Sequence, residues 1–109
     1  MTPTQRSLKL LRDDGWTAEV VERWNPHARI RHDLFGVVDI LAIRDGETLA
    51  VQTTSGSCVS ARIKKIADSP HIGAIRKAGW SFHVHGWRKV KVNRGGKATR
   101  WQPRIVDVS

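Results

Sequence analysis

The fold of this chain is decided by residues 36–56, which read GVVDILAIRDGETLAVQTTSG. Two apolar runs rich in Val and Ile flank the pair Asp45-Gly46, and Asp-Gly is a preferred type I′ turn pair between antiparallel strands. The sequence therefore predicts a β-hairpin with Asp45 and Gly46 at its tip.

This register brings three polar side chains together. Asp39 lies directly opposite Gln52, and Thr54 joins their face by the two-residue period of a strand. Asp39 is the informative one, because burying its carboxylate without a partner or a metal would cost several kcal/mol. An alternative is that Asp39 lies near the rim of the sheet and accepts hydrogen bonds from loop amides or from an arginine.

The residues before the hairpin predict a helix and then a strand. Thr2 and Gln5 read as the two halves of a capping box and Pro3 as the first helical residue, so we expect a helix over residues 3–14. Residues 17–24 have strand composition, and the Asn-Pro pair and scattered polar residues that follow predict a long basic loop.

Two helices and more strands are expected after the hairpin. Ser57 is a candidate N-cap for a helix with apolar residues at helical spacing, and Ser69-Pro70 opens a short helix that closes at Gly79. A strand follows in WSFHVHGW, and a second hairpin turns at Gly95-Gly96. We predict one α/β domain over residues 1–109, with a core over about residues 3–90 and a basic β-ribbon over about residues 87–106.

The charge of the chain indicates a polyanionic partner. Its 19 Lys and Arg residues exceed its 10 Asp and Glu residues, which gives a net charge of +9. Residues 1–59 hold 7 basic and 8 acidic residues, whereas residues 60–109 hold 12 basic and 2 acidic ones. This segregation favours nucleic acid over a basic surface that serves only solubility.

The composition also excludes some classes of protein. No segment approaches the roughly 18 apolar residues of a membrane span, and the N-terminus lacks a secretory signal. A cytoplasmic protein without a membrane partner is expected. Cys58 is the only cysteine, so an internal disulfide and a zinc site built from several thiolates are excluded.

The hairpin resembles the core of the PD-(D/E)xK nuclease superfamily, particularly its Holliday-junction-resolvase-like and VRR-type members. In that family the Asp of a GxxD strand and the E/Q-x-K of the next strand bind a divalent metal and activate water. Gly36 and Asp39 match GxxD, Gln52 takes the acidic position, and Thr54 takes the position of the lysine. The resemblance implies a restriction-endonuclease-like core, a mixed central sheet flanked by helices, with a C-terminal basic β-hairpin.

The same resemblance implies the site. Asp39, Gln52 and Thr54 would be catalytic, with Asp39 and Gln52 as ligands of Mg²⁺ or Mn²⁺. The family lysine is missing, and Lys64 or Lys65 would replace it from the following helix; we assign Lys65 to the catalytic group. A second carboxylate would come from Glu22 or Asp33, although each also has an ordinary role as a surface or loop residue. We rank Asp33 low.

The C-terminal ribbon predicts a surface for nucleic acid. A turn at Gly95-Gly96 places Lys91 opposite Arg100 and puts an aromatic residue on the face of two lysines, which suits base stacking and phosphate contact. The alternative is that the tryptophan packs on the protein core. The residues predicted to contact nucleic acid are Arg29, Arg31, Arg62, Lys64, Lys65, Trp87, Lys89, Lys91 and Arg100.

Three functions stay open from the sequence. They are a metal-dependent endonuclease acting on duplex or branched DNA, an inactive DNA-binding relative on the same fold, and a basic module that docks on RNA or protein. His83 and His85 alternate on one strand face with metal-ligand spacing, but no third ligand is recognisable. The sequence also leaves a homodimer open.

Overall fold

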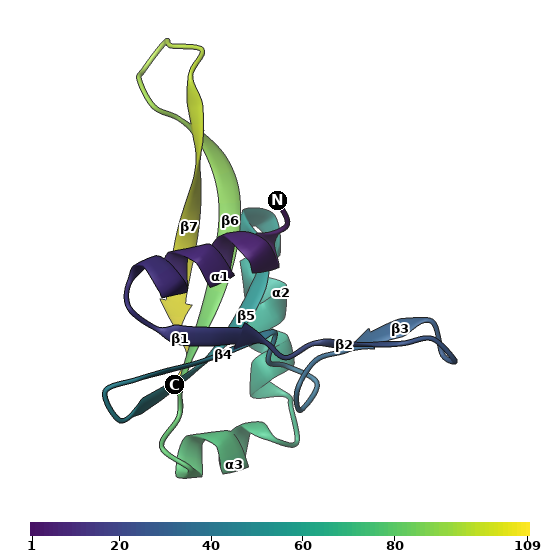
Figure 1. The fold of residues 1–109 in the computed structure, drawn as a ribbon. Helices are drawn as coiled ribbons and strands as arrows, with labels where there is room; N and C mark the ends of the chain where they lie inside the picture. Colours follow the sequence, from purple (N-terminus) through teal and green to yellow (C-terminus); the bar gives the residue numbers. More distant parts are fainter.

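The computed structural model describes residues 1–109 and contains a five-stranded sheet with helices on both faces (Figure 1). No helix has the length and apolar character that crossing a membrane requires. The elements, in chain order, are α1 (Pro3–Asp13), β1 (Thr17–Val20), β2 (Arg23–Asn25), β3 (Ile30–His32), β4 (Ile40–Arg44), β5 (Glu47–Ser55), a 3₁₀ turn (Gly56–Cys58), α2 (Val59–Ala67), α3 (Ile72–Lys77), β6 (Ser81–Lys91) and β7 (Thr99–Asp107).

The sheet is mixed, and its strand order is β1-β4-β5-β6-β7. Strands β5 and β6 are parallel, and the other neighbouring pairs are antiparallel. The parallel pair needs a crossover, which α2 and α3 provide. The predicted α/β class, a mixed central sheet flanked by helices, is confirmed.

Each face of the sheet has its own apolar core. On one face Leu11 of α1 packs with alternate residues of β4 and β5. On the other, Val59 and Ile66 of α2 and Ile72 and Ile75 of α3 pack with Ala50, Phe82 and Val84. The two cores together make a three-layer arrangement.

A glycine sets the distance between α2 and the sheet. A Cβ added at Gly86 would overlap the Cγ2 methyl group of Val59. Glycine at this position lets the first turn of α2 lie directly on β6, which fixes where the basic side chains further along α2 can reach.

The predictions for the N-terminal helix and the central hairpin are confirmed. Thr2 Oγ1 accepts from the Gln5 backbone N–H at 3.1 Å, and Gln5 Oε1 accepts from the Thr2 backbone N–H at 3.0 Å, which completes the capping box. Asp45 and Gly46 both have positive φ, at 50° and 80°. Ile40 pairs with Val51 in β4–β5, which is the register predicted for the hairpin.

The prediction of one strand over residues 17–24 is wrong. The strand ends at Val20, where the Val21 backbone N–H donates to the Asp39 carbonyl, and the chain then leaves the main sheet. It forms a separate two-stranded ribbon, β2–β3, within the region predicted as a loop, and Figure 1 shows this ribbon projecting from the body.

Ser57 does not cap α2. Residues 56–58 form a 3₁₀ turn, and the N-cap is Cys58 without a side-chain hydrogen bond. The Ser57 hydroxyl instead lies 3.2 Å from that of Ser55. The short third helix is present as α3, and the chain turns at Gly79, where φ is 80°.

The C-terminal strands pair one residue away from the predicted register. Lys91 lies opposite Thr99 and Val90 opposite Arg100. The reason is a longer turn: the Val92 backbone N–H donates to the Ala98 carbonyl, so the connection is wider than a two-residue Gly-Gly turn. Lys91 and Arg100 are therefore not opposed.

Candidate metal centre and nucleic-acid interface

Asp39 is buried directly before β4, with 4% of its surface exposed. Its Oδ2 accepts from the Thr53 backbone N–H at 2.8 Å, from the Thr53 hydroxyl at 3.2 Å and from Gln52 Nε2 at 3.2 Å. The structure thus brings Asp39 and Gln52 together. Thr54 is buried and forms no hydrogen bond with Asp39. The threonine that contacts this carboxylate is Thr53.

Two further carboxylates lie beside Asp39. Ligand oxygens of Glu22, Asp33 and Asp39 all lie within 4.8 Å of one another. Glu22 lies between β1 and β2, and Asp33 directly follows β3, so the small ribbon brings both residues to the sheet. We call Glu22, Asp33, Asp39 and Gln52 the Asp39 cluster. The sequence named both extra carboxylates and ranked Asp33 low; the β2–β3 ribbon, which was not foreseen, brings Asp33 as well as Glu22 beside Asp39.

Three ionised carboxylates this close together repel one another. Burial and, to a smaller extent, the neighbouring Asp33 carboxylate raise the pKa of Asp39 to about 6 against the opposing effect of the Thr53 backbone N–H. A carboxylate in this setting is stabilised by a proton or by a cation.

Basic side chains reach the edge of the cluster. Lys65 Nζ of α2 lies 3.8 Å from Asp33 Oδ2, and Arg31 lies 3.3 Å from Glu22 Oε1. Lys64, the neighbour of Lys65, forms no ion pair. Lys65 is therefore the lysine of α2 that lies beside the carboxylates.

Gln52 adds a buried polar atom without a partner next to the carboxylates. The residue is 1% exposed, and its Oε1 is buried without a hydrogen-bond partner. Its Nε2 points to Asp39 and lies 3.5 Å from Asp33 Oδ2. A half-turn of the amide would aim Oε1 at the carboxylates instead. Three carboxylates and an amide oxygen are the donor set that Mg²⁺ and Mn²⁺ prefer, so these residues fit a divalent ion.

Trp87 does not form part of an exposed surface. It shares a strand face with Lys89 and Lys91 as expected, but α1 covers it, and its Nε1 donates to Ser7 Oγ at 2.7 Å. The prediction that Trp87 stacks on nucleic acid is wrong, because the packing of α1 was not foreseen.

The exposed aromatic residue of this region is Trp101 of β7. It lies opposite Lys89, whose Nζ is 5.6 Å from the ring centroid, and the Arg6 guanidinium of α1 lies 4.1 Å from the same centroid. Sequence reasoning missed this group because the register of β6–β7 was off by one residue. The other residues predicted to contact nucleic acid are solvent-accessible: Arg29, Arg31, Arg62, Lys64, Lys65, Lys91 and Arg100.

His85 belongs to a second buried polar group under α1. Its Nδ1 lies 2.9 Å from Ser7 Oγ, which also accepts from Trp87. Burial lowers the pKa of His85 to about 4. We call Ser7, His85 and Trp87 the Ser7 cluster. His83, the other histidine with metal-ligand spacing on this strand, has its Nε2 3.9 Å from Asp107 Oδ2.

Comparison with protein-family models, with curated proteins and with solved structures finds no match for this chain.

Proposed function

We propose that this protein is a DNA endonuclease that depends on Mg²⁺ or Mn²⁺ and has a restriction-endonuclease-like core of the PD-(D/E)xK kind. The observation that carries the proposal is the convergence of three carboxylates and Gln52 beside Lys65. The mixed sheet with helices on both faces is compatible with such a core.

In this proposal the Asp39 cluster holds the ion through carboxylate oxygens and Gln52 Oε1. A divalent ion there would polarise a phosphodiester and lower the pKa of a bound water. Asp39 is fixed by its hydrogen bonds to Thr53, so its free Oδ1 has a defined direction.

Lys65 would take the catalytic role of the lysine that the family motif contains and that this chain lacks at residue 54. Its ammonium group offers a positive charge to the phosphate as negative charge develops on it. Asp33 positions this side chain through the 3.8 Å ion pair, and Thr54, which carries no charge, is left with a role in the strand.

The basic hairpin β6–β7 would bind the DNA backbone. Its far end extends beyond α1 in Figure 1, and it carries exposed Lys89, Lys91 and Arg100, with Lys89 over the Trp101 ring. Phosphate contacts of this kind release counterions, so affinity for duplex DNA should fall steeply with salt.

The test is a cleavage time course on linear duplex, branched and single-stranded DNA, and on RNA, with Mg²⁺ or Mn²⁺. We expect Asp39→Ala to lower the cleavage rate on the order of a hundredfold or more, as loss of a main electrostatic element does in other enzymes. Lys65→Ala should lower the rate as well. The matched controls are Asp13→Ala, which removes an exposed carboxylate of α1, and Lys64→Ala. Equal rates for Asp39→Ala and Asp13→Ala would refute the proposal.

The second candidate is a DNA-binding protein on the same fold that does not cleave. It is favoured by Gln52, an amide at an acidic family position, and by the three donors that already occupy Asp39 Oδ2. Salt-dependent DNA binding without metal-dependent cleavage in any assay would support this candidate.

A further inference from the structure

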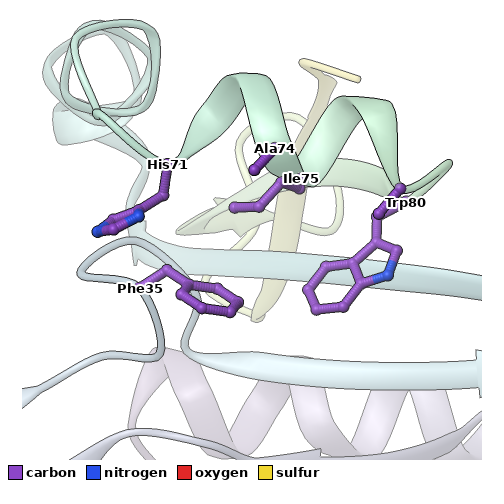
Figure 2. Close-up of a pocket in the computed structure, with 6 residues that line it drawn as sticks. Phe35, His71, Ala74, Ile75 and Trp80 are labelled. Carbon is purple, nitrogen blue, oxygen red and sulfur yellow. The ribbon is translucent and has the colours of Figure 1, made fainter.

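A small apolar pocket lies between α3 and the turn that carries Phe35. Its volume is about 130 Å³. Figure 2 shows the Phe35 ring facing the underside of α3, with His71 at one end and Trp80 at the other. Cavities of about 150 Å³ hold a benzene ring, so this pocket has room for one planar ring system and not for a peptide helix. It is lined by Phe35, His71, Ala74, Ile75, Ala78 and Trp80.

The aromatic walls are open to a further ring. The centroid of Phe35 lies 5.6 Å from that of His71 and 6.2 Å from that of Trp80, and both pairs are tilted, at 41° and 48°. Tilted rings do not cover one another's faces, so a planar ligand can stack on Phe35 or Trp80.

Phe35 occupies this place against its backbone preference. It has a φ of 54° and is 45% exposed. The turn is closed by the Gly36 backbone N–H, which donates to the Asp33 carbonyl at 2.9 Å. Glycine or asparagine suits a left-handed turn position better than a bulky residue does, so the turn geometry alone does not favour phenylalanine here.

Lys65 links the surroundings of the pocket to the Asp39 cluster. A neighbouring hollow shares Phe35 and His71 with the pocket and is also lined by Lys65. Lys65 Nζ in turn lies 3.8 Å from Asp33 Oδ2, two residues before Phe35. The last turn of α3 carries Arg76 and Lys77, and no acidic residue lies in that helix.

We propose that this pocket binds one unstacked nucleobase of the nucleic acid whose phosphate lies at the Asp39 cluster. The inference rests on the proposed function and adds a substrate preference to it. An aromatic slot of single-ring width beside cationic side chains matches a base attached to a phosphate chain, because bases stack on aromatic rings while lysines bind the backbone. The protein therefore prefers nucleic acid with an unpaired base, in a single strand, a bulge or a branch point.

The test compares three fluorescently labelled probes without metal, so that no cleavage occurs. They are a thymine-bearing single strand, the same strand with abasic residues, and a fully paired duplex. We expect the base-bearing strand to bind on the order of tenfold more tightly than the abasic strand, which is the scale of one stacked base.

Two variants address the pocket from opposite directions. Phe35→Asn removes the ring and suits a positive φ, and Ala78→Trp fills the space. Each should abolish the difference between base-bearing and abasic strands and leave duplex affinity unchanged. Ile43→Thr, which alters an exposed apolar residue of β4, is the matched control and should keep the difference. Circular dichroism melts of each variant establish that it is folded.

Several results would overturn the inference. If all probes bind, but abasic residues do not weaken the binding of the single strand and Phe35→Asn affects all probes equally, the pocket is not a base site. The proposed function then still stands. If sedimentation shows a dimer that Phe35→Asn dissociates, the pocket belongs to a second copy of the chain. If no probe binds even at low salt, the proposed function fails and the base site with it.

Discussion

The Asp39 cluster and the Ser7 cluster are both buried polar groups, and they differ in how completely their atoms are satisfied. In the Ser7 cluster the serine hydroxyl meets both the Trp87 indole and the His85 ring, and His85 is neutral. In the Asp39 cluster, carboxylates crowd together and an amide oxygen is left without a partner. A satisfied buried group specifies packing, whereas an unsatisfied one signals a ligand.

The two clusters also respond to pH in opposite directions. Asp39 has a folded pKa of about 6, above its ordinary value of 3.8, so the folded state loses stability as the pH rises from about 4 to about 6. His85 has a folded pKa of about 4, below its ordinary value of 6.5, so the folded state gains stability as the pH rises from about 4 to about 6.5. The two effects largely cancel in the wild type.

The largest expected effect on stability comes from neutralising Asp39. At pH 8 in EDTA, Asp39→Asn should raise the free energy of unfolding by about 3 kcal/mol, because a pKa shift of about two units is removed at about 1.4 kcal/mol each. The Asn side-chain oxygen can keep the hydrogen bond from Thr53. Urea denaturation measures this, with Asp13→Asn as the surface control. A loss of stability at pH 8 would mean that the carboxylate is not strained.

The same variant should expose the pH dependence of the other cluster. In Asp39→Asn no carboxylate offsets the effect of His85, so the free energy of unfolding of this variant should fall by about 3 kcal/mol between pH 6.5 and pH 4. That of the wild type should fall by less. Urea midpoints across this range provide the measurement. If the free energies of unfolding of the two proteins changed with pH in parallel, Asp39 and His85 would not have opposite effects on stability.

A smaller loss is expected from breaking the Ser7 cluster. Ser7→Ala leaves the buried Trp87 N–H without an acceptor, so the free energy of unfolding should fall by about 2 kcal/mol. Ser60→Ala, on the exposed face of α2, is the matched control and should change it by less than about 0.5 kcal/mol. Equal effects of the two variants would show that the Ser7 hydroxyl is not needed.

Metal binding should stabilise the wild type in a pH-dependent manner. At a metal concentration tenfold above its dissociation constant, Mn²⁺ should add about 1.4 kcal/mol at pH 8. The gain should shrink at pH 5, where Asp39 holds a proton. Thermal melts with and without EDTA measure the gain, and Asp39→Asn should show much less of it. A gain that is equal in both proteins would place the ion elsewhere.

The smallest effect concerns the edge of the Asp39 cluster. The Lys65 side chain is 43% exposed, so Lys65→Met should change the free energy of unfolding by less than about 1 kcal/mol. Lys64→Met serves as the reference. A larger loss in Lys65→Met alone would show that Lys65 has a structural role rather than the proposed catalytic one.

The sequence determined the features that depend on neighbouring residues. The capping box of α1 involves residues three apart, and the Asp45-Gly46 turn sets the hairpin register that brings Asp39 to Gln52. Such features need only local hydrogen bonds and backbone preferences, so pattern reasoning found them. The mixed α/β sheet also followed, because apolar alternation and helical spacing identify which elements must share a core.

Only the tertiary structure decided which distant residues meet. The β2–β3 ribbon carries Glu22 and Asp33 to Asp39, the packing of α1 buries Trp87, and a wider turn shifts β6–β7 by one residue. None of these contacts is encoded within a short window. They depend on how whole elements pack. Burial of apolar surface determines where each helix and strand lies, and the position of the backbone then determines which polar side chains meet.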